Sequence, residues 1–140
     1  RSAFEWKARF DRHRVARPSA EPFGVEFEIE AYLQSHADRF VPTFDANSYL
    51  YLSRAMDLFD AAEHGASLEE AVARIRARVL VIGVETDLLF PLEQQRALAD
   101  LFVATGHETV FAPLPSVQGH DSFLIDLPRF SPPIRAFLAR

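Results

Sequence analysis

The sequence predicts an α/β fold in which a helical region, residues 1–64, precedes an α/β region, residues 65–140. Two apolar runs and the segments around them predict it. The run RVLVIGV at 78–84 is nearly all aliphatic, which is typical of a parallel strand buried on both faces. A second short run, ETVFAPL, lies at 108–114. Helical segments before, between and after the runs complete the alternation of a parallel sheet with crossover helices.

The first region shows helical patterns and no convincing strand. The stretch ARPSAEPFG at 16–24 contains two prolines and a glycine, which predict a connector. The apolar residues that recur at helical spacing after it are Ile29, Leu33 and Phe40. A second helix is predicted at about 47–63, where Asp45 or Asn47 is expected to cap its start. Its apolar stripe consists of Leu52, Ala55, Met56 and Phe59.

The second region begins with a helix whose capping box is Ser67 and Glu70. The buried stripe expected of this helix is Leu68, Val72 and Ile75. After the first strand, the loop ETDLLFP leads to a helix that Pro91 opens and Thr105 closes. The second strand leads through the loop PSVQGHDSF to a last helix, predicted at about 132–138.

The composition and the net charge of the chain argue against several classes of function. The chain has 140 residues, of which 49% are hydrophobic and 25% charged, as in a soluble globular domain. The net charge of -5 argues against nucleic-acid binding, because proteins that bind nucleic acids usually have an excess of basic residues. The sequence has no cysteine and no apolar run approaching the roughly 18 residues of a membrane helix, and we expect no signal peptide. We therefore expect a cytoplasmic protein with neither nucleic acid nor membrane as a partner.

Two polar residues follow the ends of the predicted strands. Asp87 comes shortly after the first strand, and His120 lies in the loop after the second. Loops at the carboxyl ends of neighbouring parallel strands converge, so a carboxylate there can accept the histidine Nδ1 proton and fix the tautomer. The chain order Asp, helix, strand, Gly-His matches the acid and base of an α/β-hydrolase triad. The alternatives are a turn aspartate and a solvated loop histidine.

The nucleophile of such a triad is missing from the sequence. There is no G-x-S-x-G elbow and no cysteine, and neither Ser116 nor Ser122 follows a strand-to-helix turn. The chain begins with Arg1 and lacks early strands, so we expect it to be the last third of a larger fold. The five histidines are scattered without metal-ligand spacing, and no metal site is expected.

Three stretches of the sequence carry a resemblance to a known family: FEIEAYLQSHADRFVPTFDANSYLYLSRAMDLFD (27–60), VLVIGVETDLLFPLEQQ (79–95) and GHDSFLID (119–126). They resemble homoserine O-acyltransferases of the α/β-hydrolase fold, which move an acetyl or succinyl group from coenzyme A to a side-chain hydroxyl. The segments RSAFEW, PFGVEFEIEAYL and SHADRFV are most similar to the branch that acylates L-serine, which includes serine O-succinyltransferases. One departure is Asp11, which stands where relatives usually have glycine.

The resemblance implies roles for three residues of this chain. Asp87 matches the triad acid, His120 matches the general base, and Asp121 matches an aspartate that holds the amino group of the acceptor amino acid. Residues 1–64 match a helical lid that roofs the active-site tunnel and mediates a homodimer, and residues 65–140 match the C-terminal part of the core. The nucleophilic serine, the oxyanion hole and the carboxylate-binding arginine are implied to lie in an N-terminal remainder of the same enzyme.

The implied reaction is ping-pong transfer from acyl-CoA, a co-substrate, with no permanently bound cofactor. The resemblance leaves the donor open between acetyl-CoA and succinyl-CoA, and the acceptor open between L-serine and L-homoserine. An esterase or thioesterase of the same fold would carry the same Asp87 and His120 pair. A non-catalytic dimerisation fragment is a further alternative, although it would expose the sheet edge.

Overall fold

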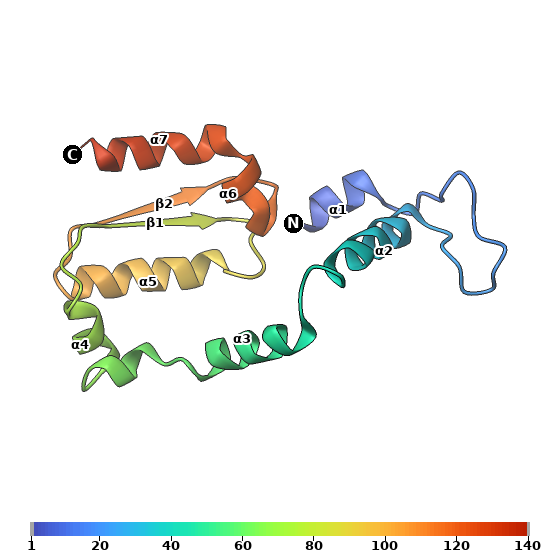
Figure 1. Ribbon diagram of the computed structural model, residues 1–140. Coiled ribbons are helices and arrows are strands. Elements are labelled where there is room, and N and C mark those ends of the chain that lie inside the picture. Colours follow the sequence, from blue (N-terminus) through green and yellow to red (C-terminus); the bar gives the residue numbers. More distant parts are fainter. Residues whose placement is uncertain (1, 140) are drawn as a thin grey trace. The chain divides into compact units, whose positions relative to one another are not determined.

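The computed structural model describes residues 2–139 and divides them into two compact units. Residues 7–59 form a helical unit, and residues 2–6 with 60–139 form an α/β unit. The elements labelled in Figure 1, together with two short 3-10 turns, are in chain order α1 (Ala3–Arg9), α2 (Glu28–Phe40), α3 (Ala46–Leu58), η1 (Ala61–His64), α4 (Leu68–Ala73), β1 (Val79–Val84), α5 (Leu92–Ala104), β2 (Thr109–Leu114), η2 (Gly119–Asp121), α6 (Ser122–Ile125) and α7 (Leu127–Leu138).

The helix α3 of the helical unit is capped at its start and ends earlier than the sequence predicts. Asp45, one of the two expected caps, accepts a hydrogen bond from the Ser48 amide at 2.6 Å. The predicted helix at 47–63 is wrong beyond Leu58, because Phe59 has an extended backbone with φ -74° and ψ 121°. Asp60 then starts the separate turn η1 by accepting from the Ala62 amide at 2.9 Å. A local side-chain cap, directly after the apolar stripe, therefore starts a new turn inside the predicted helix.

The turn after α1 contains the residue that departs from the family pattern. Asp11 has a φ of +37°, in the left-handed region that glycine occupies without steric cost and aspartate tolerates. Beside it, the buried Phe10 ring packs on the Tyr32 ring of α2 at 5.0 Å between centroids. The Arg9 guanidinium lies over both rings, 4.9 Å and 4.8 Å from their centroids. These contacts hold the left-handed turn next to a small aromatic core.

The α/β unit is built on a parallel pair of strands, as predicted. Val79 pairs with Thr109 and Val84 pairs with Leu114, so the six residues of each strand are in register. Helices α5 and α7 lie on opposite sides of the pair (Figure 1). The buried apolar residues between these layers are Val81, Val84, Ala99 and Leu114. Because the strands run parallel, both exit loops lie at the same edge of the sheet.

Two helix predictions in this unit need correction. The last helix begins at Leu127, not near residue 132, because the Asp126 carbonyl accepts from the Arg129 and Phe130 amides and starts the first turn before the internal prolines. At α4, Ser67 accepts from the Glu70 amide at 3.3 Å, as expected of a cap. Of the predicted buried stripe of α4, only Val72 is buried. Leu68, at the start of the helix, is 39% exposed, and Ile75, which lies beyond the end of the helix at Ala73, is 44% exposed.

Candidate active site

The pairing of β1 with β2 continues one residue past the end of β1. The Glu85 amide donates to the Leu114 carbonyl at 3.1 Å, which adds one backbone bond to the ladder. Two residues further along, the His120 Nδ1 atom lies 3.0 Å from the Asp87 carboxylate. The structure therefore brings the two predicted residues into contact, since neighbouring parallel strands deliver their exit loops to one edge.

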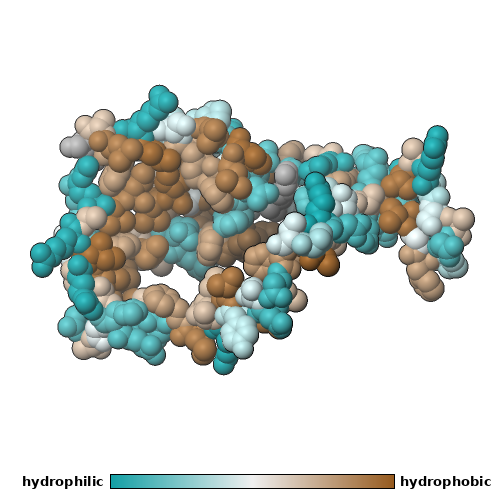
Figure 2. Space-filling model, in the orientation of Figure 1, coloured by the Kyte–Doolittle hydropathy of each residue, from teal (hydrophilic) through white to brown (hydrophobic). Residues whose placement is uncertain are grey.

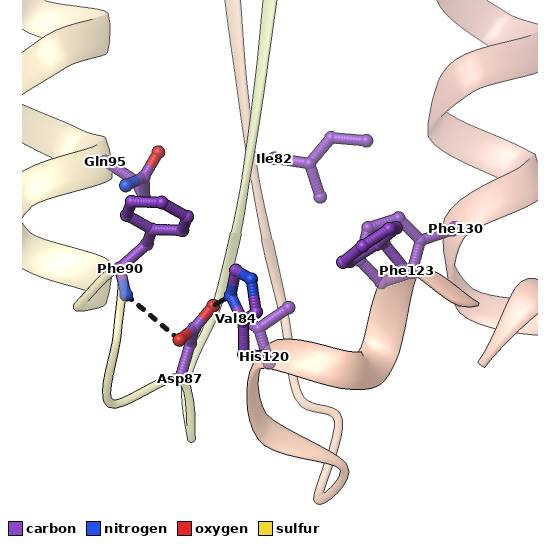
Figure 3. A pocket seen from close by; sticks show the side chains of 8 residues that line it. All are labelled: Ile82, Val84, Asp87, Phe90, Gln95, His120, Phe123 and Phe130. Atoms are coloured by element: carbon purple, nitrogen blue, oxygen red, sulfur yellow. Dashed lines mark hydrogen bonds and ion pairs between the residues drawn. The ribbon is translucent and has the colours of Figure 1, made fainter. Parts of the chain in front are cut away.

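Asp87 is a largely buried carboxylate that accepts three hydrogen bonds. One oxygen accepts from the Leu89 amide at 2.9 Å and the Phe90 amide at 3.0 Å, and the other faces His120 (Figure 3). Burial raises the pKa of Asp87, whose side chain is 9% exposed. The hydrogen bonds from Phe90, His120 and Leu89 outweigh burial, so the net pKa lies below the ordinary value of 3.8. The group is therefore an anion at neutral pH.

His120 is held by this anion and by two aromatic rings. Because an ionised carboxylate only accepts, Nδ1 must donate, and in a neutral ring Nε2 is then the basic atom. Phe90 and Phe123 contact the imidazole at centroid distances of 5.0 Å and 5.8 Å. The His120 side chain is 29% exposed. Within residues 2–139 no group forms a hydrogen bond with Nε2, so this atom can accept a proton from a reacting group.

The loop that carries His120 is tied together by two serines. Ser116 Oγ donates to the Asp126 carboxylate at 2.7 Å, and Ser122 Oγ donates to the Gly119 carbonyl at 2.6 Å. Both serines are fully buried, so their hydroxyls serve the loop and neither is a nucleophile in this arrangement. Gly119 has a φ of +61°, which a glycine adopts at no steric cost, and it starts the turn η2, in which His120 is the middle residue.

Asp126 is a further carboxylate of this region, and its position in the sequence did not indicate its role in the histidine loop. Hydrogen bonding from Ser116 is the main cause that lowers its pKa, and Arg129 also lowers it through contacts of 3.1 Å and 2.8 Å. Ser116 and Asp126 are ten positions apart, and the hydrogen bond between them joins the two ends of the loop that carries His120. A sequence signal existed, since a serine and an aspartate flank the loop, but spacing alone does not show that they meet.

The pair lies in a cleft of about 370 Å³. Its lining is mostly apolar and consists of Ile82, Val84, Asp87, Phe90, Gln95, His120, Phe123 and Phe130. Figure 3 shows Phe123 and Phe130 on the side of the cleft away from α5. A mostly apolar cleft with a few polar side chains is a typical site for a small molecule. Asp121 is half-buried in the turn η2 beside His120, and it is not among the lining residues.

Among residues 2–139, no group of three or more histidine, aspartate or glutamate side chains is arranged to hold a metal ion. No helix within the same residues is long and apolar enough to cross a membrane.

Comparison with known proteins finds similar sequences over almost the whole chain. No family model matches the sequence. The serine O-succinyltransferase of Litchfieldella anticariensis is 54% identical over 99% of this chain, and that of Xylella fastidiosa strain M12 is 51% identical over 99%. The chain spans 39% and 38% of the length of these two relatives.

Solved structures share the fold. The homoserine O-acetyltransferase from Bacillus anthracis superposes with a TM-score of 0.83 at 27% identity, over 99% of this chain and 37% of that structure. Esterase E22 superposes with a TM-score of 0.70 at 29% identity, over 81% of this chain and 30% of that structure. The fold is thus the C-terminal portion of an α/β-hydrolase, and over 99% of its length the sequence is similar to part of proteins named serine O-succinyltransferase.

Proposed function

We propose that the full-length protein containing this chain is an O-acyltransferase that moves an acyl group from acyl-CoA to the side-chain hydroxyl of L-serine or L-homoserine. The observation that carries the proposal is the 3.0 Å contact between Asp87 and His120 in an apolar cleft. The relatives at 54% and 51% identity are named serine O-succinyltransferases, which favours succinyl-CoA and L-serine among the candidate substrates.

The proposed mechanism uses His120 as the base and acid of both half-reactions. A serine of the N-terminal remainder attacks the thioester carbonyl while His120 Nε2 takes its proton. The carbon–sulfur bond breaks, His120 protonates the departing thiolate, and coenzyme A leaves an acyl-serine ester. The acceptor hydroxyl then gives its proton to His120, forms the new ester bond and releases the enzyme serine, which regains the proton. Asp87 keeps Nδ1 protonated throughout and stabilises the imidazolium.

Two partners are part of the proposal. One is the N-terminal remainder with the nucleophile, which we propose packs on the strands. Figure 2 shows apolar side chains over the strands between α5 and α7, and an exposed apolar surface of this kind marks a contact with other protein. The other is a second copy, bound through the helical unit, where Phe40, Val41 and Leu50 line an exposed apolar groove and are 51%, 74% and 64% exposed.

The function is tested by mixing the full-length protein with succinyl-CoA or acetyl-CoA and with L-serine or L-homoserine. Release of coenzyme A that depends on the acceptor, with O-acyl amino acid as product, is the expected result. The likeness to esterase E22 makes hydrolysis the second candidate. Acyl-CoA hydrolysis at the same rate with and without acceptor would favour a thioesterase and refute the transferase. Matched reactions with L-alanine, which lacks the hydroxyl, provide the control.

Asp121 is proposed to bind the acceptor ammonium, since an ionised carboxylate beside His120 offers a charge-assisted hydrogen bond. Replacement of Asp121 with alanine should raise the acceptor KM or lower acceptor turnover by about 10-fold to 100-fold, because such a bond contributes about 1.5–3 kcal/mol. Release of coenzyme A in the first half-reaction should stay within about two-fold of the parent, since that step occurs before the acceptor binds. Rapid-quench measurement of both half-reactions decides the matter, and equal losses in the two would argue against amine binding.

A further inference from the structure

Thr86 connects the two loops of the site at the residue just before the acid. Its hydroxyl donates to the Ser116 carbonyl at 2.6 Å and accepts from the Gly119 amide at 3.1 Å. Gly119 directly precedes His120, as Thr86 directly precedes Asp87. The contact between Thr86 and Gly119 therefore runs beside the contact between Asp87 and His120, and each joins positions 33 residues apart.

The hydroxyl is well suited to hold both loops in place. A threonine hydroxyl has one donor and two acceptor sites, and here one of each is used by backbone groups of the histidine loop. Ser116 and Gly119 are both buried, so solvent does not easily replace these bonds. The backbone amide of Glu85 also binds the Leu114 carbonyl, so residues 85, 86 and 87 each form a hydrogen bond with the end of β2 or with the segment that follows it. The bonds of residues 86 and 87 use side chains, and they extend the hydrogen bonding between the two strands.

We propose that Thr86 is a positioning residue that sets the distance and angle between Asp87 and His120. The inference rests on the proposed function for the role of His120 as the base, and it adds the group that places that base. Thr86 does not line the cleft. It acts through the backbone at Gly119, whose displacement would move the imidazole. A misplacement of about 1 Å at a reacting group can lower a rate by about 100-fold, so a hydroxyl that fixes this backbone governs turnover.

The test is Thr86→Val in the full-length protein, because valine keeps the shape and removes the hydroxyl. We expect kcat to fall by about 10-fold to 100-fold while both KM values stay within about two-fold, since binding surfaces are unchanged. The downfield proton resonance of Nδ1–H, which reports the hydrogen bond from His120 to Asp87, should shift upfield or broaden. Thr86→Ser restores the hydroxyl and should return both the resonance and kcat to near the parent values.

Thr105→Val is the matched control. The Thr105 hydroxyl donates to the Leu101 carbonyl at 2.9 Å, near the far end of α5, so the same substitution removes a similar bond away from the site. It should leave kcat and the resonance unchanged. If Thr86→Val does not fold, Thr86→Ala removes the hydroxyl without added bulk and carries the same expectations.

Three outcomes would overturn the proposal. These are a parental kcat and resonance in Thr86→Val, equal losses in Thr86→Val and Thr86→Ser, and an equal loss of kcat in Thr105→Val. The resonance needs no substrate, so it separates this proposal from the proposed function. A parent protein that transfers no acyl group but shows a resonance lost only in Thr86→Val would refute the transferase and support the positioning role.

Discussion

Replacing His120 with alanine in the full-length protein is expected to abolish the burst of coenzyme A that accompanies acyl-enzyme formation. The substitution removes the atom that takes the nucleophile's proton and leaves the Asp87 carboxylate without its partner at 3.0 Å. Loss of a triad base lowers kcat by up to about 10⁶-fold, because the remaining triad members act only as a unit with it. Stopped-flow detection of free thiol after mixing with acyl-CoA measures the burst directly.

The control for this variant is His107→Ala. His107 lies in the same unit and contacts the Ile75 and Phe102 carbonyls at 2.6 Å and 3.2 Å, close to the beginnings of the strands. Its loss should lower the unfolding temperature and leave the burst amplitude intact, because it is remote from the cleft-lining residues. A burst of undiminished rate and amplitude in His120→Ala would rule out His120 as the base.

Asp87→Asn is expected to lower kcat by about 10⁴-fold with little change in backbone geometry. An asparagine amide can donate to Nδ1, which moves the ring proton to Nε2 and removes the basic atom from the reacting side. Asp45→Asn is the matched control, since asparagine caps a helix as well as aspartate does, and it should leave kcat unchanged. Steady-state rates of the three proteins compare the effects, and a parental rate in Asp87→Asn would contradict the orienting role.

The same variant has a stability signature that depends on pH. The pKa of Asp87 is lower in the folded chain than its ordinary value of 3.8, so the ionised form stabilises the fold. This contribution is complete above the ordinary pKa and is lost as the pH falls through the folded pKa. Asp87→Asn lacks the titrating group, and its unfolding temperature should therefore decline less steeply than that of the parent in this acidic range.

The strands and the candidate pair were predictable because their signals are local. A short aliphatic run such as 79–84 is typical of a strand that is buried on both faces, and it forms a strand here. A second strand after one helix makes the pair parallel, and parallel strands end at the same edge. Asp87 and His120 follow those ends, so their approach depends on chain order more than on the details of any loop.

Other features were not predictable because a distant or competing contact decides them. Asp60 caps a separate turn within the predicted helix at 47–63, and the Asp126 carbonyl starts α7 ahead of two prolines that indicate a boundary in sequence. The bonds of Thr86 to the histidine loop join residues 30 and 33 positions apart. Any threonine offers a hydroxyl, and only the folded loops determine which buried backbone groups need it.

The sequence by itself thus determined which residues bear charge and where each strand ends, because hydrophobic periodicity and capping act over a few neighbouring positions. The tertiary structure alone decided how firmly His120 is held: by Asp87 at 3.0 Å, by two aromatic rings and by a loop closed between Ser116 and Asp126. The physical reason is that hydrogen-bond partners in loops are selected by distances and directions that exist only after the sheet and its covering helices have packed.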